Sequence, residues 1–463
     1  SGTLVAYAVV VPGAQKGKTL TCTMIVNDFL SVKLSAQMLC DFEGGKYYTL
    51  PLNASVFVNN GATVEDKTPA DAEPVAGQPS NCYMINAAKT YSFNATVIGN
   101  GEAGIIADAG FHTTSASIDP KSAKLMWEDT EGFISGVSLV KGKVLFTAEK
   151  NVGNAMIAVF DGAGTVLWSW HIWGVGDTMP EDEKVYSQAT ISANSTLKVN
   201  YTVMDRALGA LSKTSYFTTL YQWGRKDPIP NSTVYFVDGQ AAEIETTYPV
   251  HKPGSAADAT ILTSIQHPEC IIDDYKGQAG DWLASDKTNK YNLLWGDANT
   301  TYVFNKSKPA AGKGWTNGKT IYDPCPSGYR VSSKFAWTGF CGSSSGDTKN
   351  IDYINFVKYE NGYYFKKNSS DGVGIYFPMT GSRGCKTGSL WVGSGASAYS
   401  SLNHDASYWA SAPSQNLGKG ARMSISPYVA SPSSSTQTSA NSINTVDESG
   451  NRSAAHPVRC IRE

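Results

Sequence analysis

Hydrophobic and polar positions alternate along much of the chain, with the period of two that is typical of half-buried β-strands. Before residue 60, the alternation is clear in TLTCTMIVND (19–28) and KYYTLPLNASVFV (46–58), with a turn expected at Glu43–Lys46. The next stretch, Asn59–Pro79, is polar and contains prolines, which is typical of a linker. We therefore expect residues 1–75 to form a partial β segment followed by a linker.

A second series of strand-like segments occupies residues 80 to 175. Gly-containing turns separate them at short intervals, which predicts a β-sandwich over residues 76–180. The segments are CYMINA (82–87), TYSFNATVIG (90–99), AKLMWED (123–129), KVLFTAE (143–149), NAMIAVFD (154–161) and TVLWSWHIW (165–173). Asp161–Gly164 lies between two apolar runs, as a hairpin turn would. The charged, Pro-containing segment Thr178–Lys184 then predicts a domain boundary.

Residues 181–463 differ in character, because long stretches rich in Gly, Ser, Asn and Tyr are interrupted only by brief apolar runs. Two segments could form short helices, Asp205–Leu211 and Lys334–Phe340. The stretch Ser426–Ser442 is Ser-rich and of low complexity, which favours a long exposed loop.

Composition narrows the class of protein. The net charge of -2 cannot supply the basic surface of a nucleic-acid-binding protein, so no nucleic-acid partner is expected. The longest apolar run, Ala6–Pro12, is too short to span a bilayer, so no membrane-spanning segment is expected. No signal peptide is visible, and we interpret the chain as a mature or trimmed form, whose first domain is then expected to be incomplete. The abundance of aromatic and turn-forming residues favours a β-rich extracellular protein.

Motifs for enzyme chemistry are not found in the sequence. The six histidines show neither HxxxH nor HExxH spacing, and there is no GxSxG nucleophile motif or P-loop. The acidic residues do not form an EF-hand loop. We therefore predict no catalytic residue, no metal site and no cofactor.

The aromatic segment WSWHIW has two interpretations. On a strand, Trp168 and Trp170 share one face, while His171 and Trp173 share the other. Two aromatic rings on one face could stack on a sugar ring. The apolar residues around them favour a buried core instead.

Two further motifs carry charged residues beside apolar ones. In MDRALGA, a bidentate ion pair of Arg206 with Asp205 would hold a turn in place. Acid–base catalysis would need a second carboxylate, and none is identified. In LYQWGRKDP the side chains could line a pocket, but a core Trp223 with polar neighbours is favoured.

A set of distinctive strings occurs in a defined order along the chain. They are SNCYMINAAKTYSF (80–93), NAMIAVFDGAGTVLWSWHIW (154–173), YTVMDRALGA (201–210), TTLYQWGRKDP (218–228), IYDPCPSGYRV (321–331), IYFPMTGSRG (375–384), YWASAP (408–413) and HPVRCIRE (456–463). In this order they resemble surface lipoproteins and fimbrillin-family proteins of Bacteroidetes. The latter half resembles the Fibrobacter-type paralogous domain, which is similar to C-type lectin-like folds.

This resemblance implies a mainly β, multidomain fold. Residues 1–75 would be a partial fimbrillin-like segment, residues 76–180 a β-sandwich, and residues 181–463 a C-type lectin-like α+β domain with long loop insertions. It also implies a non-enzymatic adhesion protein at the cell surface, associated with the outer membrane, as a tip or accessory subunit of a fimbria. Expected partners are other pilus subunits, joined by strand addition, and surface glycans or proteins. The calcium–sugar motifs of C-type lectins are not found.

Within these motifs, several cysteines are candidates for structural disulfides. In DPCPSGYR, two prolines fix the backbone around Cys325 and Gly328 permits a tight turn. HPVRCIRE alternates, so that Cys460 faces the same way as Val458. A Cys325–Cys460 bond would therefore staple the last strand to this turn. A Cys341–Cys385 bond would be a second staple.

The alternative hypothesis is a surface glycan-binding protein of a polysaccharide-uptake system. A glycan site needs exposed aromatic rings flanked by amide or carboxylate groups. The candidate ligand-binding residues are Trp391, Tyr399, Asn403, Trp409, Tyr363 and Tyr364. Because YWASAP is also typical of a core strand, adhesion through a pilus remains the first hypothesis.

Overall fold

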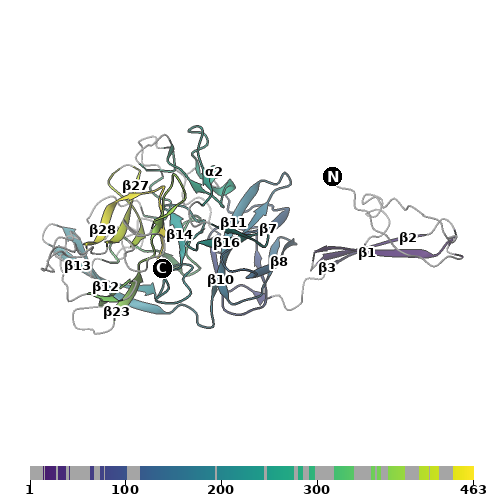
Figure 1. The fold of residues 1–463 in the computed structure, drawn as a ribbon, viewed down its shortest axis with the longest axis horizontal. Helices are drawn as coiled ribbons and strands as arrows, with labels where there is room; N and C mark the ends of the chain where they lie inside the picture. The colour runs from purple at the N-terminus through teal and green to yellow at the C-terminus, as the bar shows by residue number, and fades with distance from the viewer. Residues whose placement is uncertain are drawn as a thin grey trace. The chain divides into compact units, whose positions relative to one another are not determined.

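A computed structural model gives the fold of the chain (Figure 1). It describes residues 14, 16–27, 30–37, 41, 63–66, 73–77, 79–101, 115–192, 195–243, 248–275, 280–284, 291–297, 318–337, 356–359, 362–366, 374–391, 406–416, 418–426 and 442–463. The chain divides into two compact units, residues 1–72 and 73–463. Strands account for 45% and helices for 3%, which confirms the mainly β class with several sheets.

The N-terminal unit contains a three-stranded antiparallel sheet in the order β1-β2-β3. Its strands are β1 (Thr19–Asn27), β2 (Leu30–Gln37) and β3 (Thr63–Asp66). The predicted strand at 19–28 is thus confirmed, while residues 46–58 and the turn at 43–46 lie outside the described residues. β3 falls within the predicted linker, so that prediction was wrong there.

In the second unit, residues 73–175 contribute to two sheets that form a sandwich. The first has the order β17 (Gln240–Glu243), β16 (Val234–Val237), β7 (Ser122–Glu128), β10 (Val152–Phe160), β11 (Val166–Val175) and β5 (Cys82–Ile85). The second has the order β4 (Glu73–Pro74), β6 (Thr90–Asn94), β9 (Lys143–Ala148) and β8 (Ile134–Val140). Phe93 of β6 packs on Trp170 of β11, with ring centroids 5.0 Å apart, so the two sheets share a core.

The predicted strands of this region are present. The hairpin turn between β10 and β11 is also confirmed, because the Asp161 carboxylate accepts hydrogen bonds from the backbone N–H groups of Ala163 and Thr165, each at 2.8 Å. The sequence did not predict β8. This strand contains Gly136 at φ +60° and a register shift between Ser135 and Ser138, which interrupts the simple alternation.

β11 is buried on both faces. Trp168, Trp170 and Trp173 are each at most 1% exposed, which confirms the core interpretation of WSWHIW. Side chains on the second face, such as Ser169 and His171, contact residues from 221–227 instead of the second sheet. A strand covered on both sides carries an almost continuous apolar run, as the sequence of β11 does.

The expected domain boundary near residue 180 does not separate two compact units. β16 and β17 come from beyond that position, yet they extend the sheet of β7 and β10. One hydrophobic core contains residues from both sides of the boundary, including Trp170, Trp223 and Val458. Residues 76–180 and 181–463 therefore fold around a common interior.

The remaining strands of the second unit form five further sheets. Two are larger: one has the order β12 (Asp182–Ser192), β13 (Ser195–Met204), β30 (Cys460–Arg462) and β20 (Tyr329–Val331), and the other has the order β15 (Ile229–Pro230), β14 (Thr219–Gln222), β29 (Ala455–Pro457), β24 (Ser382–Arg383) and β25 (Leu390–Trp391). A two-stranded sheet pairs β18 (Val250–His251) with β19 (Ile271–Ile272). The two three-stranded sheets are β21 (Phe356–Tyr359), β22 (Gly362–Lys366) and β23 (Gly374–Pro378), and β26 (Ala406–Pro413), β27 (Lys419–Ser426) and β28 (Ser442–Asn451).

Alternate side chains of the C-terminal segment, residues 456–463, pack into two different hydrophobic cores. Val458 and Cys460 belong to the core that contains the sandwich, while Ile461 belongs to a second core with Phe377. The Arg459 guanidinium lies 4.1 Å from the centroid of the Phe377 ring, on that second side. The predicted alternation of HPVRCIRE is therefore confirmed, and it lets one segment fasten two packed regions together.

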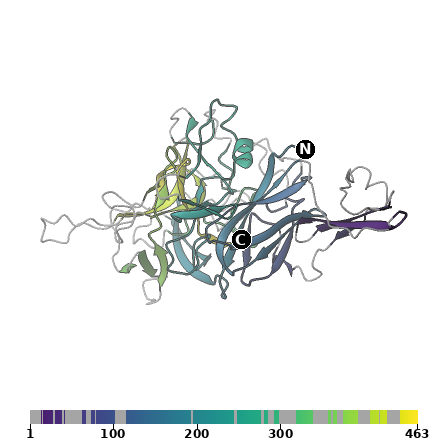
Figure 2. The same ribbon diagram turned by 45° about the vertical axis from the view of Figure 1, so that its right-hand side comes forward.

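The described residues contain one helix, α2 (Ile261–Gln266), which lies against β11 (Figure 2). Thr260 caps it, since its side chain accepts a hydrogen bond from the Thr263 backbone N–H. The two expected helices are not formed as predicted. Residues 205–211 form turns in which Gly209 adopts φ +77°, and residues 334–337 also form a turn.

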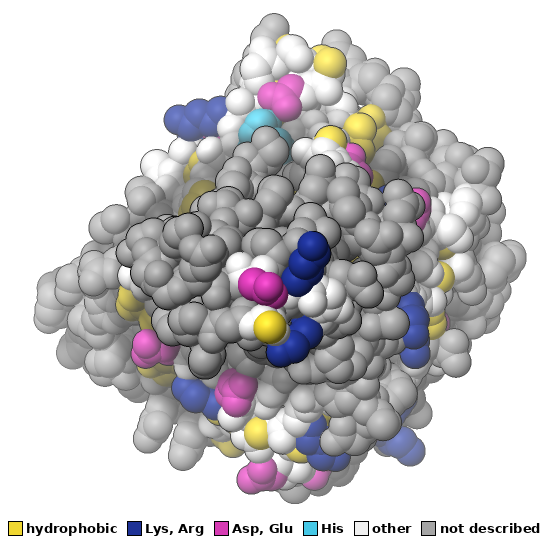
Figure 3. All heavy atoms as spheres, turned by 90° about the vertical axis from the view of Figure 1, so that its right-hand side faces the viewer, with side chains coloured by type: hydrophobic (Ala, Val, Ile, Leu, Met, Phe, Trp, Pro, Cys, Tyr) yellow, Lys and Arg dark blue, Asp and Glu magenta, His cyan; other side chains and the backbone are white. Residues whose placement is uncertain are grey.

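The surface carries charges of both signs. On the face shown in Figure 3, Lys and Arg side chains are interspersed with Asp and Glu, in keeping with the net charge of -2. Within the described ranges, no helix has the length and apolar character needed to cross a membrane.

Candidate functional site

Two of the predicted glycan-contacting side chains lie in the interior. Trp409 is fully buried, its Nε1 donates a hydrogen bond to the Tyr221 carbonyl at 2.7 Å, and its ring meets His456 edge-on. Tyr363 is 1% exposed and belongs to the core of β22 and β23. Assigning these two residues to a ligand platform was wrong, because packed strands cover both rings.

The other predicted platform residues are only partly described. Tyr364 is half-buried and packs against Tyr376, with ring centroids 4.9 Å apart. Trp391 is in β25, and its side chain is not described. Tyr399 and Asn403 lie outside the described residues. The three candidates whose side chains are described, Tyr363, Tyr364 and Trp409, therefore do not form an exposed aromatic surface.

Cys325 and Cys460 form a disulfide with a Cα–Cα distance of 6.0 Å, as the sequence predicts. The second predicted staple is not formed. Cys385 is a free, half-buried thiol near Asp273 and Asp274, while Cys341 lies outside the described residues. Cys385 sits in the β24–β25 hairpin, where its neighbours are carboxylates.

A buried cation organises the turn that carries Cys325. Lys319 is 6% exposed, and its Nζ donates to the carbonyls of Cys325, Pro326 and Tyr329 at 2.7, 2.8 and 2.5 Å. Asp323 accepts from the backbone N–H groups of Cys325 and Val331, each at 2.9 Å. Burial lowers the pKa of Lys319, and the charge of Asp323 opposes this effect. A buried ammonium thus binds the carbonyl groups of the turn, while a buried carboxylate binds its N–H groups.

Cys82, Asn154, His171 and Tyr221 form a second buried cluster. His171 Nδ1 lies 3.5 Å from Cys82 Sγ and 3.1 Å from the Tyr221 hydroxyl, while Nε2 lies 2.9 Å from Asn154 Oδ1. The Asn154 amide nitrogen donates to Asp129 Oδ2 at 2.7 Å, which orients its oxygen toward His171. The partners therefore assign the proton of the neutral imidazole to Nε2, with Nδ1 as the acceptor.

The electrostatics of this cluster keep it neutral. Thiol catalysis uses a thiolate beside an imidazolium, often with an Asn that orients the ring. Here burial raises the pKa of the Cys82 thiol well above its ordinary value, and burial lowers the pKa of His171 to about 3. Both groups are uncharged at neutral pH. The cluster therefore links β5, β10, β11 and β14 through hydrogen bonds between neutral side chains.

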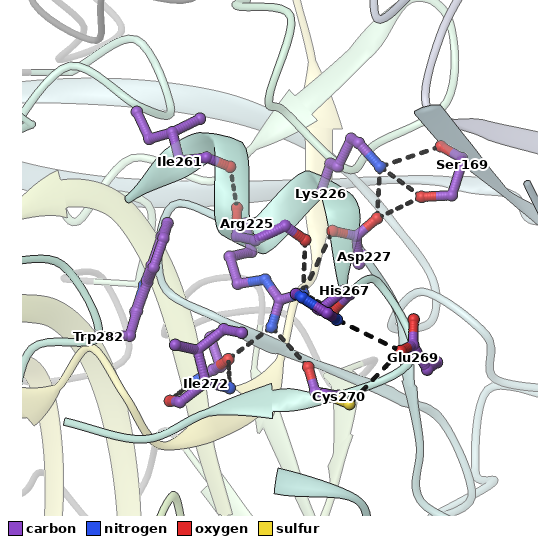
Figure 4. Close-up of polar contacts among 12 residues, drawn as sticks. Ser169, Arg225, Lys226, Asp227, Ile261, His267, Glu269, Cys270, Ile272 and Trp282 are labelled. Carbon is purple, nitrogen blue, oxygen red and sulfur yellow. Dashed lines mark hydrogen bonds and ion pairs between the residues drawn. The ribbon is translucent and has the colours of Figure 1, made fainter. Parts of the chain in front are cut away.

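A third buried cluster joins α2 to the sandwich (Figure 4). The Arg225 guanidinium donates to the carbonyls of Ser264 and His267, both at 3.2 Å, and of Cys270 at 2.8 Å. A cation beside the last carbonyls of a helix satisfies acceptors that have no partner within the helix. Its NH2 group also lies 3.4 Å from Asp227 Oδ2, so Arg225 is charge-compensated.

The adjacent Lys226 and Asp227 contact the second face of β11. Lys226 Nζ donates to Ser169 Oγ at 2.5 Å and to Asp227, and Ser169 Oγ donates to Asp227 Oδ1 at 2.6 Å. The ammonium also lies 4.4 Å from the ring centroid of Trp168. Burial lowers the pKa of Lys226, and Asp227 opposes the change. These contacts attach residues 225–227 to the sandwich.

The bidentate pair predicted in MDRALGA is present. Arg206 Nε and NH2 donate to Asp205 Oδ1 and Oδ2 at 2.8 and 3.2 Å. Arg206 NH1 also donates to the Leu211 carbonyl at 3.0 Å, so the pair holds the turn at 205–211. Trp223 is fully buried and its Nε1 donates to the Ala410 carbonyl at 3.0 Å, which confirms its predicted core position.

Residues of the types that bind metal ions lie close together after β19 and in the β24–β25 hairpin. One ligand atom from each of Asp273, Asp274 and Cys385 lies within 4.8 Å of the other two. Nearby in sequence, the rings of His251 and His267 stack with centroids 4.6 Å apart, and His251 Nε2 lies 3.1 Å from Asp258 Oδ1. Burial raises the pKa of Asp274, and its Asp273 neighbour adds to the rise.

The hydrogen-bonded cluster around His171 was not predicted from the sequence. Neither was the Lys319 clamp, by which we mean Lys319 with the three carbonyl groups that it binds. Cys82 and His171 are 89 residues apart, and neither belongs to a short motif of catalysis or metal binding. The clamp did leave a local signal, because Asp323 is the first residue of the predicted DPCPSGYR turn and Lys319 lies four positions before it. No spacing rule would have assigned a buried position to that lysine.

No family model, curated protein or solved structure matches this chain. Its function is therefore inferred from the motifs of its sequence and from the geometry of its described side chains.

Proposed function

We propose that the chain is a non-enzymatic cell-surface adhesion protein, a tip or accessory subunit of a pilus. Residues 1–72 are the joining unit, a partial fimbrillin-like sandwich that adds a strand from a neighbouring subunit. Residues 181–463 form the C-type lectin-like part, which faces the surface to be bound. The protein works outside the cell, associated with the outer membrane.

The observation that carries this proposal is the pairing of β1. This nine-residue strand has β2 on one side and, among the described residues of the N-terminal unit, no partner on the other. The unpaired side of an edge strand presents N–H and C=O groups that another chain can pair with. An edge strand of this length, without a second partner among the described residues, suits strand addition between subunits.

The second unit supports the proposal by its internal fastening. The Cys325–Cys460 disulfide closes a sequence separation of 135 residues, and buried cations hold the backbone carbonyls of neighbouring turns. A domain at the tip of a fibre carries force and is exposed to proteases. Covalent closure and clamped turns resist both, because they limit local opening.

The proposal is tested by proline substitutions at two consecutive positions, Thr21→Pro and Cys22→Pro, made one at a time. Successive N–H groups of an antiparallel strand point to opposite sides, so one substitution removes a donor from the open side of β1. That variant should keep its sheet but lose incorporation into high-mass surface complexes, measured by immunoblot of sheared surface material and by surface labelling.

Thr21→Ala and Cys22→Ala are the matched controls, because alanine keeps both N–H groups. The proposal fails if both proline variants enter high-mass complexes as the alanine variants do. It also fails if the parent chain is never exposed on the cell surface.

Glycan binding is the second candidate function, because exposed aromatic side chains are present in the second unit. Trp409 and Tyr363, two of the six predicted glycan-contacting residues, are buried, but a different pair of aromatic side chains, Tyr216 and Phe217, is exposed in the second unit.

A further inference from the structure

Exposed apolar side chains of the second unit concentrate in one short loop. Among the described residues, three of the six exposed large hydrophobic side chains lie within residues 211–217. They are Leu211, Tyr216 and Phe217, with exposed fractions of 40%, 40% and 43%. We name this segment the 211–217 loop. Single exposed apolar residues are ordinary, but a cluster usually marks a contact surface.

The two aromatic rings of the loop lie together. In an extended chain, neighbouring side chains point to opposite sides. Tyr216 and Phe217 are neighbours, yet their ring centroids are only 4.3 Å apart and their planes meet at 37°. The Ser215 hydroxyl donates to the Phe217 carbonyl at 2.9 Å, which holds the backbone in this turned form. The two rings are therefore adjacent and both partly exposed to solvent.

The loop is fastened at both ends by buried polar side chains. Arg206 NH1 donates to the Leu211 carbonyl at 3.0 Å, and Asn231 Nδ2 donates to the Tyr216 carbonyl at 3.1 Å. Arg206 is 6% exposed and Asn231 is 3% exposed. Interactions that rigidify a binding segment in advance reduce the entropy lost on binding. The rings are therefore exposed on a loop whose backbone conformation is fixed before a ligand binds.

The rim of the loop is polar and its charges are compensated. Lys213 Nζ lies 2.6 Å from Glu181, 3.5 Å from Asp205 and 3.8 Å from Glu183, so its charge is matched within the protein. Ser212 and Thr214 add exposed hydroxyl groups. This rim favours an uncharged ligand with many hydroxyls over a strongly charged one.

We propose that the 211–217 loop is a carbohydrate-binding site whose aromatic pair stacks on the C–H face of a neutral pyranose in a polysaccharide. The negative face of an aromatic ring attracts the partly positive C–H edge of another group. The rim hydroxyls and the Tyr216 hydroxyl then bond to sugar hydroxyls. This inference rests on the proposed adhesion role and gives it a ligand class and a site.

The size of the patch favours a glycan over a protein partner. At about 40% exposure of side chains that each measure about 150–250 Å², the two aromatic rings offer on the order of 150 Å². A stable protein interface covers about 800 Å² on each partner. One or two sugar rings match the smaller area.

The test is affinity gel electrophoresis of the full chain in native gels that contain a soluble β-glucan, mannan, galactan or xylan. We expect at least one of these neutral polysaccharides to retard the parent protein. The Tyr216→Ala/Phe217→Ala double variant should bind that polysaccharide at least about tenfold more weakly, because both stacking faces are lost.

The matched control is Leu262→Ala, which removes an equally exposed apolar side chain, 45% exposed on α2, and should leave retardation unchanged. Near-UV circular dichroism of all three proteins verifies that each is folded. The proposal is overturned if none of the four polysaccharides retards the parent chain. It is also overturned if the double variant is retarded as strongly as the parent.

A result in which the double variant loses binding to a protein partner, while no polysaccharide retards the parent, would replace the glycan with a protein ligand and so overturn the proposal. The adhesion role is measured separately, by incorporation of the β1 proline variants into surface complexes. A chain that enters those complexes but ignores every polysaccharide retains the pilus role without this site.

Discussion

Cys82 and Cys325 belong to the same hydrophobic core but meet different neighbours. Cys325 is bonded to Cys460, and its backbone carbonyl accepts a hydrogen bond from the buried Lys319. Cys82 is a free thiol whose sulfur lies beside His171. The region around Cys325 is stabilised by a disulfide and a buried ammonium group, whereas the region around Cys82 is stabilised by hydrogen bonds between uncharged side chains.

The difference shows two ways to bury polar groups in one core. At Lys319, three carbonyls and a nearby carboxylate compensate a charge that would otherwise be costly to bury. At His171, desolvation removes the charge itself, since the imidazole stays neutral. Loss of a partner should therefore be severe in the first region and mainly pH-dependent in the second.

The largest expected effect comes from removing the disulfide with Cys325→Ser/Cys460→Ser. In the chain-entropy model, a bond that closes 135 residues stabilises the fold by about 5 kcal/mol. Urea unfolding of the variant should show a loss of that order. Cys385→Ser, which removes a free thiol, is the control and should change stability by less than about 1 kcal/mol. Equal stabilities of the double variant and the parent would contradict the structural role of the bond.

The second effect tests the clamp at Lys319. Lys319→Met keeps a long apolar stem but leaves three buried carbonyls without their donor, which should cost about 3 kcal/mol or more in urea unfolding. Lys121→Met removes an exposed lysine paired with Asp119 and should cost less than about 0.5 kcal/mol. A loss at Lys319 as small as that at Lys121 would show that the clamp contributes little.

The third effect is a pH dependence at His171. Burial lowers the pKa of His171 to about 3, whereas an unfolded histidine titrates near ~6.5. Between these values the unfolded chain binds a proton that the folded chain excludes, so stability falls as the pH falls. His171→Gln should remove about 1.4 kcal/mol per pH unit from the slope of unfolding free energy between pH 6 and pH 4.

The difference between the parent and the His171→Gln variant isolates the contribution of His171 to the pH dependence of stability. Burial also lowers the pKa of His456, but that group is common to parent and variant and cancels in the difference. Parallel stability curves for parent and variant over this range would mean that His171 is protonated in the fold, contrary to its neutral hydrogen-bond network.

The smallest effect concerns reactivity and not stability. Cys82 is 1% exposed and burial raises its pKa, so native alkylation by iodoacetamide at pH 8 should be slow. The half-buried Cys385 should be labelled at least about tenfold faster, and both should react alike in denaturant. Peptide mapping by mass spectrometry measures the two rates. Equal native rates would indicate that the core around Cys82 opens readily.

Prediction from the sequence worked best for strands whose apolar and polar residues alternate regularly. The alternation around β7, β9 and β10 predicted those strands, and the turn at Asp161 predicted the β10–β11 hairpin. It was misleading at residues 205–211, where a helical pattern is overridden by the Asp205–Arg206 ion pair and by Gly209. Local propensity is weak compared with such tertiary contacts.

The sequence could not decide which aromatic residues are exposed to solvent. Trp409 and Tyr216 both lie among polar and aromatic neighbours in the sequence, but the first is fully buried and the second is 40% exposed. Exposure depends on which distant strands cover a side chain. Trp409 contacts Tyr221, and those two residues are 188 positions apart.

By itself, the sequence determined the mainly β class, most strands of the sandwich and the core role of WSWHIW, which follow from local periodicity. It also proposed the Cys325–Cys460 pairing, which the structure confirmed across 135 positions. Only the tertiary structure decided that β11 is covered on both faces, that His171 is neutral beside Cys82, and that the aromatic rings of the 211–217 loop are exposed. Burial and desolvation are properties of the whole packed chain, so no local pattern encodes them.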